Sequence, residues 1–307
     1  MLVTEPDDGI APFLALIKKA THSLDLVMYE LTDPAVVTAL DAAAARGVAV
    51  RVILNRTFPS SGDEFLSASA RAPNDRAFAA LSAAHVAVRW ASDDFTFTHE
   101  KAMVVDGAHG FIMSFNLVPK YYPTGRDFGV IDDDAADVAA MESTFNDDWN
   151  GDPDGDAAPT GDDLVWSPGS RAAILNMIQS AAHSLDIYNE EMADDDVVAA
   201  LVAAARRGVD VRIIMTTSPS WTTAFRTLTV AGAHVYTYPA TASALYIHAK
   251  MIVADAARAF IGSENFSETS LDHNRELGVL ITNPAIITSL KRTFAADQGG
   301  AIPFTPP

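Results

Sequence analysis

The chain has 307 residues, 49% of them apolar, so it can bury a large core in one or two domains. Its 40 acidic and 21 basic residues give a net charge of −19, whereas proteins that hold nucleic acid mainly through phosphate contacts show basic clusters. It contains no cysteine, which excludes disulfides and thiolate metal sites.

The sequence shows no feature that would place the chain in a membrane or mark it for export. No stretch approaches the roughly 20 consecutive apolar residues of a membrane span. The first residues, Met1–Glu5, lack the charged and apolar regions of a secretory signal. We therefore expect a soluble protein, either cytoplasmic or the mature form of a secreted one, and the sequence leaves that choice open.

The first elements in chain order predict a β-α-β unit. An amphipathic helix is expected over Asp8–Thr21, and the apolar stretch Ser23–Met28 predicts a strand. A helix over Pro34–Ala45 should follow, with Asp33 as its N-cap and a proline in its first turn. Val48–Leu54 predicts a second strand, and this order implies parallel pairing through a right-handed crossover.

The same unit recurs 161 residues later, as a strand at Ser184–Tyr188, a helix at Asp196–Arg206 and a strand at Val209–Met215. Residues further along in the two halves match at an offset of 149 instead. The first half must therefore carry about twelve additional residues, which we place in Phe58–Asn74, a segment expected to shape access to a site.

The two halves are joined by Asn150–Asp163, a segment rich in Gly, Pro and Asp that reads as an exposed connector. A calcium-binding loop is the alternative, although no glutamate closes it at the twelfth position. Further strands are expected near 128–131 and 277–281, with helices over 135–149 and 284–296. The predicted fold is α/β, with two similar halves, 1–149 and 164–307, each a mixed sheet flanked by helices. They are expected to pack about a pseudo-twofold axis.

A doubled set of polar residues accompanies this repeat, at the constant offset of 149. Its members are His99, Lys101, Asp106, Ser114, Asn116 and Arg126-Asp127 in the first half, and His248, Lys250, Asp255, Ser263, Asn265 and Arg275-Glu276 in the second. A histidine two positions before a lysine puts both side chains on one face of a strand. Imidazole, ammonium, hydroxyl and carboxamide groups can then converge on one oxyanion, as phosphoryl chemistry requires.

Two copies of HxKxxxxD, each followed by a serine and an asparagine, resemble the phospholipase D superfamily, whose members carry two such motifs at one site. The resemblance covers nearly the whole chain. It implies a phosphodiesterase or phosphatidyltransferase that works through a phosphohistidine intermediate, with no metal and no other cofactor. It says much less about the substrate, because lipid hydrolases, lipid synthases and nucleases share these residues.

The resemblance also implies roles for the motif residues. Either histidine can attack phosphorus or protonate the leaving oxygen. Similarity to bacterial phospholipases D favours His99 as nucleophile and His248 as general acid. Lys101 and Lys250 would neutralise phosphoryl oxygens, and Ser114, Ser263, Asn116 and Asn265 would donate hydrogen bonds to them. Turn capping is the alternative for the two asparagines.

The acidic members of the repeat divide into two pairs. Asp106 and Asp255 are expected to be structural and to tie turns behind the lysine strands. Asp127 and Glu276 can each accept an imidazole N–H and stabilise imidazolium. An ion pair with the adjoining arginine, Arg126 or Arg275, is the alternative for these two residues.

Three functions remain open for such a site. Aromatic residues near the motifs could contact lipid or stack nucleic-acid bases, and the acidity of the chain favours a phospholipid substrate reached by transient membrane-surface contact. A metal-independent nuclease is the alternative, and a non-enzymatic phosphate-binding module is the third. Because one chain carries both motif copies, a monomer is expected to suffice.

Overall fold

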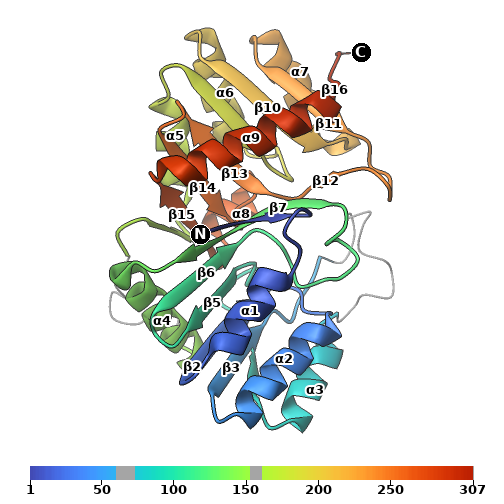
Figure 1. The fold of residues 1–307 in the computed structure, drawn as a ribbon. Coiled ribbons are helices and arrows are strands. Elements are labelled where there is room, and N and C mark those ends of the chain that lie inside the picture. Colours follow the sequence, from blue (N-terminus) through green and yellow to red (C-terminus); the bar gives the residue numbers. More distant parts are fainter. Residues whose placement is uncertain (60–72, 153–160, 307) are drawn as a thin grey trace.

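The structure is a computed structural model that describes residues 1–59, 73–152 and 161–306. Most of the predicted insertion at 58–74, and the part of the connector that bears on calcium binding, lie outside the described residues. The described residues form two mixed sheets of eight strands each, one above the other, with helices packed on both faces of the sheets (Figure 1). The predicted α/β fold with two similar halves is confirmed.

The N-terminal sheet has the strand order β1-β7-β6-β5-β2-β3-β4, and β12 from the second half pairs with β7. Its strands are β1 (Leu2–Glu5), β2 (Ser23–Met28), β3 (Ala49–Leu54), β4 (Ala87–Trp90), β5 (Lys101–Val105), β6 (His109–Met113), β7 (Gly125–Asp132) and β12 (Tyr246–Ile247). The helices of this half are α1 (Ala11–Lys19), α2 (Pro34–Ala45), α3 (Asp75–Ala83) and α4 (Ala135–Asn150). Apolar side chains of α1, α2 and α3 cover one face, and Phe145 of α4 packs on the other.

The C-terminal sheet has the order β16-β11-β10-β9-β13-β14-β15-β8. Its strands are β8 (Leu164–Ser167), β9 (Ser184–Tyr188), β10 (Asp210–Thr216), β11 (His234–Tyr238), β13 (Lys250–Ala254), β14 (Arg258–Gly262), β15 (Glu276–Ile281) and β16 (Ile302–Pro303). The helices are α5 (Arg171–Gln179), α6 (Asp195–Arg206), the 3-10 turn η1 (Pro219–Trp221), α7 (Thr222–Val230), α8 (Glu268–Asp272) and α9 (Pro284–Gly300). The long helix α9 crosses this sheet diagonally in Figure 1.

The predicted β-α-β units are present in both halves. Strands β2 and β3 pair in parallel, as do β9 and β10. The Asp33 carboxylate accepts a hydrogen bond from the backbone N–H of Ala35, and Asp194 caps α6 in the same way through Val197. Gly47 follows α2 with a φ of 92°, a conformation that favours glycine at a helix end.

The two sheets meet through one shared apolar core. Ala102, Ile112 and Phe128, from β5, β6 and β7, belong to the same cluster as Met251 and Ile261, from β13 and β14. Equivalent strands of the repeat therefore face each other, as a pseudo-twofold arrangement requires. Burying this face joins the halves into one body, since apolar burial is the main favourable contribution to association.

Each motif histidine lies just before its strand, in a short segment whose backbone pairs with the other half. The sequence predicted that the histidine and the lysine of each motif lie on one strand, but the strand begins only at the lysine, Lys101 or Lys250. The backbone N–H of His99 donates to the carbonyl of Arg275 at 2.9 Å, and that of His248 donates to the carbonyl of Arg126 at 3.2 Å. Because these amides bond to the other half, each histidine is brought next to a residue that its own half does not contain.

Candidate active site

Two histidine–carboxylate pairs cross between the halves. His99 Nδ1 lies 2.8 Å from Glu276 Oε2, and His248 Nδ1 lies 2.9 Å from Asp127 Oδ1. Because a carboxylate only accepts, each Nδ1 carries the hydrogen and each Nε2 is the atom left for chemistry. The structure thus brings together four residues that the motif analysis proposed, in a crosswise pairing.

Both carboxylates accept further hydrogen bonds, Glu276 through its other oxygen and Asp127 through the same oxygen that contacts His248. Glu276 Oε1 accepts hydrogen bonds from Ser270 Oγ at 2.5 Å and from Asn274 Nδ2 at 2.9 Å. Asp127 Oδ1 accepts one from Ser114 Oγ at 2.6 Å. These second contacts fix the carboxylates, and through them the imidazole rings.

The adjoining arginines do not engage these carboxylates. The guanidinium of Arg126 pairs with Asp297 at 2.6 Å and with Asp7 at 3.0 Å. Arg275 pairs with Asp148 at 2.7 Å. Both arginines therefore connect to helices or to the N-terminal segment, which leaves the carboxylates for the histidines.

The two lysines are buried beside the histidines. Lys101 Nζ donates to the carbonyl of His99, and Lys250 Nζ to that of His248, both at 2.6 Å. Burial, reinforced by the nearby charge of Lys250, lowers the pKa of Lys101 to about 7. An anion entering the site would restore its charged form, so Lys101 is suited to hold a phosphoryl oxygen.

The pKa of His99 lies below the ordinary range for histidine. Burial is the main cause, and the charge of Lys101 adds to it, while Glu276 acts in the opposite direction. The ring of Tyr29 lies edge-on at 4.6 Å from the His99 ring, which adds to its apolar surroundings. His99 is therefore neutral at neutral pH, with a free lone pair on Nε2.

Glu190 is a site residue that the motif analysis missed. Its Oε2 lies 2.9 Å from Lys250 Nζ and 3.4 Å from His248 Nε2, and the Tyr246 hydroxyl donates to its Oε1. Burial opposes its ionisation, but Lys250 and His248 hold its pKa well below the usual range. At the repeat offset of 161, the equivalent residue is Tyr29, so aligning the two halves beyond the motif would have revealed the difference.

The two asparagines line the cavity in front of the histidines. Asn265 Nδ2 donates to Glu190 Oε2 at 3.4 Å. The side-chain oxygens of Asn116 and Asn265 are buried without a hydrogen-bond partner in the described part of the chain. Buried polar atoms of this kind are uncommon and mark a place where a ligand group can bind.

Ser114 and Ser263 lie behind the site, fully buried, and do not line the cavity. Ser263 Oγ accepts from the backbone N–H of Leu277 at 3.2 Å, while Ser114 supports Asp127. The structure thus places both serines one layer away from the position where a phosphoryl group would bind.

Asp106 and Asp255 lie at the far ends of the lysine strands. Asp106 accepts hydrogen bonds from the backbone N–H groups of Thr21, His22 and Ser23, and Asp255 binds 182–184 in the same way. Partial burial would raise the pKa of Asp106, but these hydrogen bonds lower it to about 2. Both residues tie a turn to a strand, as expected.

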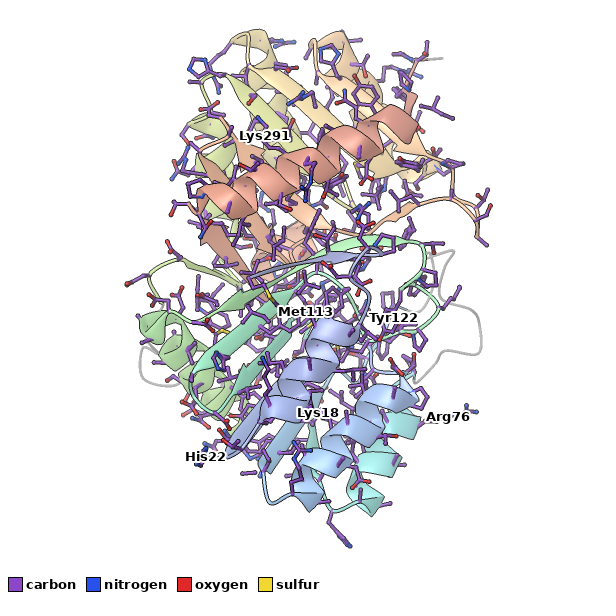
Figure 2. All side chains as sticks on the ribbon, viewed as in Figure 1. Lys18, His22, Arg76, Met113, Tyr122 and Lys291 are labelled. Atoms are coloured by element: carbon purple, nitrogen blue, oxygen red, sulfur yellow. The ribbon has the colours of Figure 1, made fainter. Side chains whose placement is uncertain are left out.

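A cavity of about 260 Å³ opens between the halves in front of both histidines. It is acidic and aromatic, and it is lined among others by Glu5, Glu30, Glu190, Glu191, Tyr29, Phe97, Phe115, Tyr121, Tyr122 and Tyr246. Burial, with the charge of Asp127, raises the pKa of Glu5 to about 7. Tyr122 lies in the loop near the junction of the halves, whereas Lys18 and Arg76 are on the outer helices (Figure 2).

In the part of the chain that the structure describes, every helix is too short or too polar to cross a membrane. Across 1–59, 73–152 and 161–306, no three histidine or carboxylate side chains gather as a group that could hold a metal ion.

Comparisons with known proteins agree with this architecture. Residues 13–149 and 174–298 match the family described as "Cardiolipin synthase, PLD-like domain". Cardiolipin synthase 2 of Bacillus cereus is 24% identical over 96% of this chain and 63% of its own length. Cardiolipin synthase of Alkalihalophilus pseudofirmus is 26% identical over 65% of this chain and 45% of its own length. The chain thus spans roughly half to two thirds of these relatives.

Two solved structures share the fold over nearly the whole chain. Phosphatidylserine synthase of Haemophilus influenzae superposes with a TM-score of 0.74, covering 99% of this chain and 87% of its own, at 11% identity. Polyphosphate kinase of Porphyromonas gingivalis gives a TM-score of 0.73, covering 97% of this chain and 46% of its own, at 14% identity. At these identities the likeness concerns the fold alone.

Proposed function

This chain belongs to the phospholipase D superfamily, in the family of cardiolipin synthase PLD-like domains, and we propose that it transfers the phosphatidyl group of a phospholipid. The observation that carries the proposal is the pair of crossed histidine–carboxylate contacts, with both histidines lining one cavity. Two imidazoles with fixed tautomers supply one nucleophile and one proton donor, which is what a two-step displacement at phosphorus needs.

In the first step, His99 Nε2 attacks the phosphorus of the phosphodiester. An N–P bond forms, and the bond from phosphorus to the headgroup oxygen breaks. His248 gives its Nε2 proton to that oxygen, so the headgroup leaves as an alcohol and not as an alkoxide. Glu276 stabilises the positive charge that develops on His99, as a carboxylate does behind other catalytic histidines.

In the second step, an acceptor hydroxyl gives its proton to His248 Nε2 and attacks phosphorus. The N–P bond breaks and His99 returns to its neutral form. Lys101, Asn116 and Asn265 would bind the phosphoryl oxygens, and Ser114 and Ser263 would position the groups in front of them. Asp127 keeps His248 in one tautomer throughout.

An alcohol is the acceptor we favour over water. The relatives are named as synthases, and a synthase must pass the phosphatidyl group to an alcohol. Hydrolysis is the same reaction with water as acceptor. Lipid is favoured over nucleic acid because several carboxylates line the cavity and would repel a polyanionic backbone. One chain supplies both histidines, so we propose a monomer that reaches lipid by transient contact with a membrane surface.

The test is an assay on vesicles of phosphatidylglycerol or phosphatidylcholine, with glycerol or ethanol as added acceptor and with single-stranded DNA in a parallel reaction. Transfer predicts the new phosphatidyl ester, which mass spectrometry identifies, and a yield that rises with acceptor concentration. A His99→Ala variant should form none. Cleavage of the DNA without any change in lipid would overturn the proposal.

A further inference from the structure

The donors of the second motif are already engaged by a carboxylate of the chain itself. Lys250 Nζ, His248 Nε2 and Asn265 Nδ2 all contact Glu190 Oε2, at 2.9, 3.4 and 3.4 Å. These are the groups that would bind a phosphoryl oxygen in the second half. A carboxylate oxygen therefore lies where an oxygen of a bound anion would otherwise lie.

The first motif has a neutral residue at this position. Tyr29 is the repeat equivalent of Glu190, and its ring lies 5.0 Å from Lys101 Nζ. A tyrosine ring accommodates a cation without neutralising it. At this position Lys250 therefore contacts a carboxylate and Lys101 contacts a neutral ring, although the motifs around them match.

Glu190 is fixed in place and faces the cavity. The Tyr246 hydroxyl donates to its other oxygen, Oε1, so both ends of the carboxylate have partners. Its side chain is 24% exposed and lines the cavity, whereas Lys250 is fully buried behind it. A purely structural partner of Lys250 could lie away from the cavity, but the Glu190 carboxylate is in the cavity wall and would contact a ligand bound there.

We propose that Glu190 determines charge specificity: it offsets the second lysine and keeps a second negative charge out of the site. A phosphodiester carries one negative charge, which Lys101 can neutralise. Inorganic phosphate and phosphomonoesters carry about 1.5 to 2 negative charges at neutral pH. The second charge would have to be placed against the Glu190 carboxylate, where repulsion at contact distance is strong.

This inference deepens the proposed function and rests on it in one respect, namely that the cavity binds a phosphoryl group. A direct consequence concerns the reaction products and the surrounding solution. Free phosphate and phosphomonoesters would bind poorly and leave the site open for a diester. The exclusion of doubly charged anions would come from the Glu190 carboxylate that contacts Lys250, not from the overall acidity of the cavity.

The experiment measures binding, not turnover, so it separates this inference from the proposed function. The full chain is titrated with inorganic phosphate and with dimethyl phosphate at pH 7.5, and binding is followed by ³¹P NMR. Glu190→Gln should tighten phosphate binding at least about tenfold, and dimethyl phosphate binding much less. Unchanged or weaker phosphate binding by a folded Glu190→Gln protein would overturn the inference, whatever the lipid assay gives.

Two further variants control the result. Glu191→Gln removes an acid that lines the same cavity, and it should alter phosphate binding by less than about twofold. An equal effect of both glutamine variants would overturn a contact-specific role. Glu190→Asp keeps the charge but shortens the side chain, and it should tighten phosphate binding to an intermediate degree. If Glu190→Gln proves unstable, the Glu190→Asp variant tests the inference instead, because Lys250 then retains a carboxylate partner in the folded chain.

Discussion

His99 in the N-terminal half donates its Nδ1 hydrogen to Glu276 in the C-terminal half at 2.8 Å, across 177 residues of sequence. His248 makes the reverse contact with Asp127. Neither half contains a complete pair, so the site exists only when the two sheets are packed together. The duplication therefore serves the chemistry as well as the fold.

The first prediction is that Glu276→Gln lowers kcat for phosphatidyl transfer about 100-fold or more. Glutamine keeps the shape but cannot stabilise imidazolium, and replacing a carboxylate behind a catalytic histidine is costly. Steady-state kinetics with one phospholipid gives the measurement. Glu268→Gln, whose side chain is 77% exposed, is the control and should change kcat by less than twofold. Equal rates in the two variants would contradict the role of Glu276.

The second prediction concerns the alkaline side of the pH profile. Lys101 has a pKa of about 7 in the free protein, so its positive charge, which attracts the phosphoryl group, is present below that pH and lost above it. Plots of log kcat/KM should therefore fall above about pH 7, since this parameter reports free-enzyme pKa values. Lys101→Arg should move the fall to higher pH, because arginine stays charged. A flat profile from pH 6 to 9 would count against Lys101.

The third prediction separates Asp106 from the chemistry. Asp106→Asn should destabilise the fold by about 1–3 kcal/mol, through weaker hydrogen bonds to 21–23, while KM and kcat stay within twofold. Its pKa of about 2 lies below the ordinary 3.8, so the wild-type contribution is complete above pH 4 and disappears as pH falls through 2. Denaturant unfolding curves of the wild type and the variant at pH 7 and pH 2.5 give the free energies of unfolding. The difference between the two proteins should be smaller at pH 2.5. A large loss of activity without loss of stability would assign Asp106 a catalytic role.

The fourth prediction is that EDTA leaves activity unchanged. The buried lysines supply the positive charge that a metal would otherwise bring, and the two histidines supply the nucleophile and the proton. The assay compares initial rates after dialysis against chelator with rates after adding back Mg²⁺, Ca²⁺ or Zn²⁺. Loss of turnover that one ion restores would show that the mechanism needs a metal.

Local signals account for much of the fold. One β-α-β unit is favoured by Asp33-Pro34 at the start of α2, by the glycine that follows α2 and by the apolar strands on either side. The sequence repeat means that the same unit forms in both halves. Helix α9 extends to Gly300, beyond the expected end near 296, because tertiary contacts such as that between Asp297 and Arg126 hold its last turn.

The site was only partly predictable, because it depends on contacts between halves. Repetition identified the histidines and lysines, but no spacing in the sequence says that Glu276 belongs with His99, 177 residues away. Glu190 escaped notice because it lies outside the motif and matters only through its position beside Lys250. The serines were expected at the phosphoryl group, yet Ser114 supports Asp127 instead, since the chain buries it completely.

The last prediction assigns the two histidines. Glu190 lies 3.4 Å from His248 Nε2, which favours a proton on that nitrogen, whereas His99 lies against Tyr29 and is neutral. We therefore expect His99 to attack and His248 to protonate. His99→Ala should abolish reaction with every substrate. His248→Ala should abolish transfer from natural lipids but retain first-step cleavage of a phosphatidyl nitrophenol, because nitrophenolate leaves without a proton. Burst kinetics and mass spectrometry should then find phosphohistidine at position 99. An adduct trapped at His248 in the His99 variant would reverse the assignment.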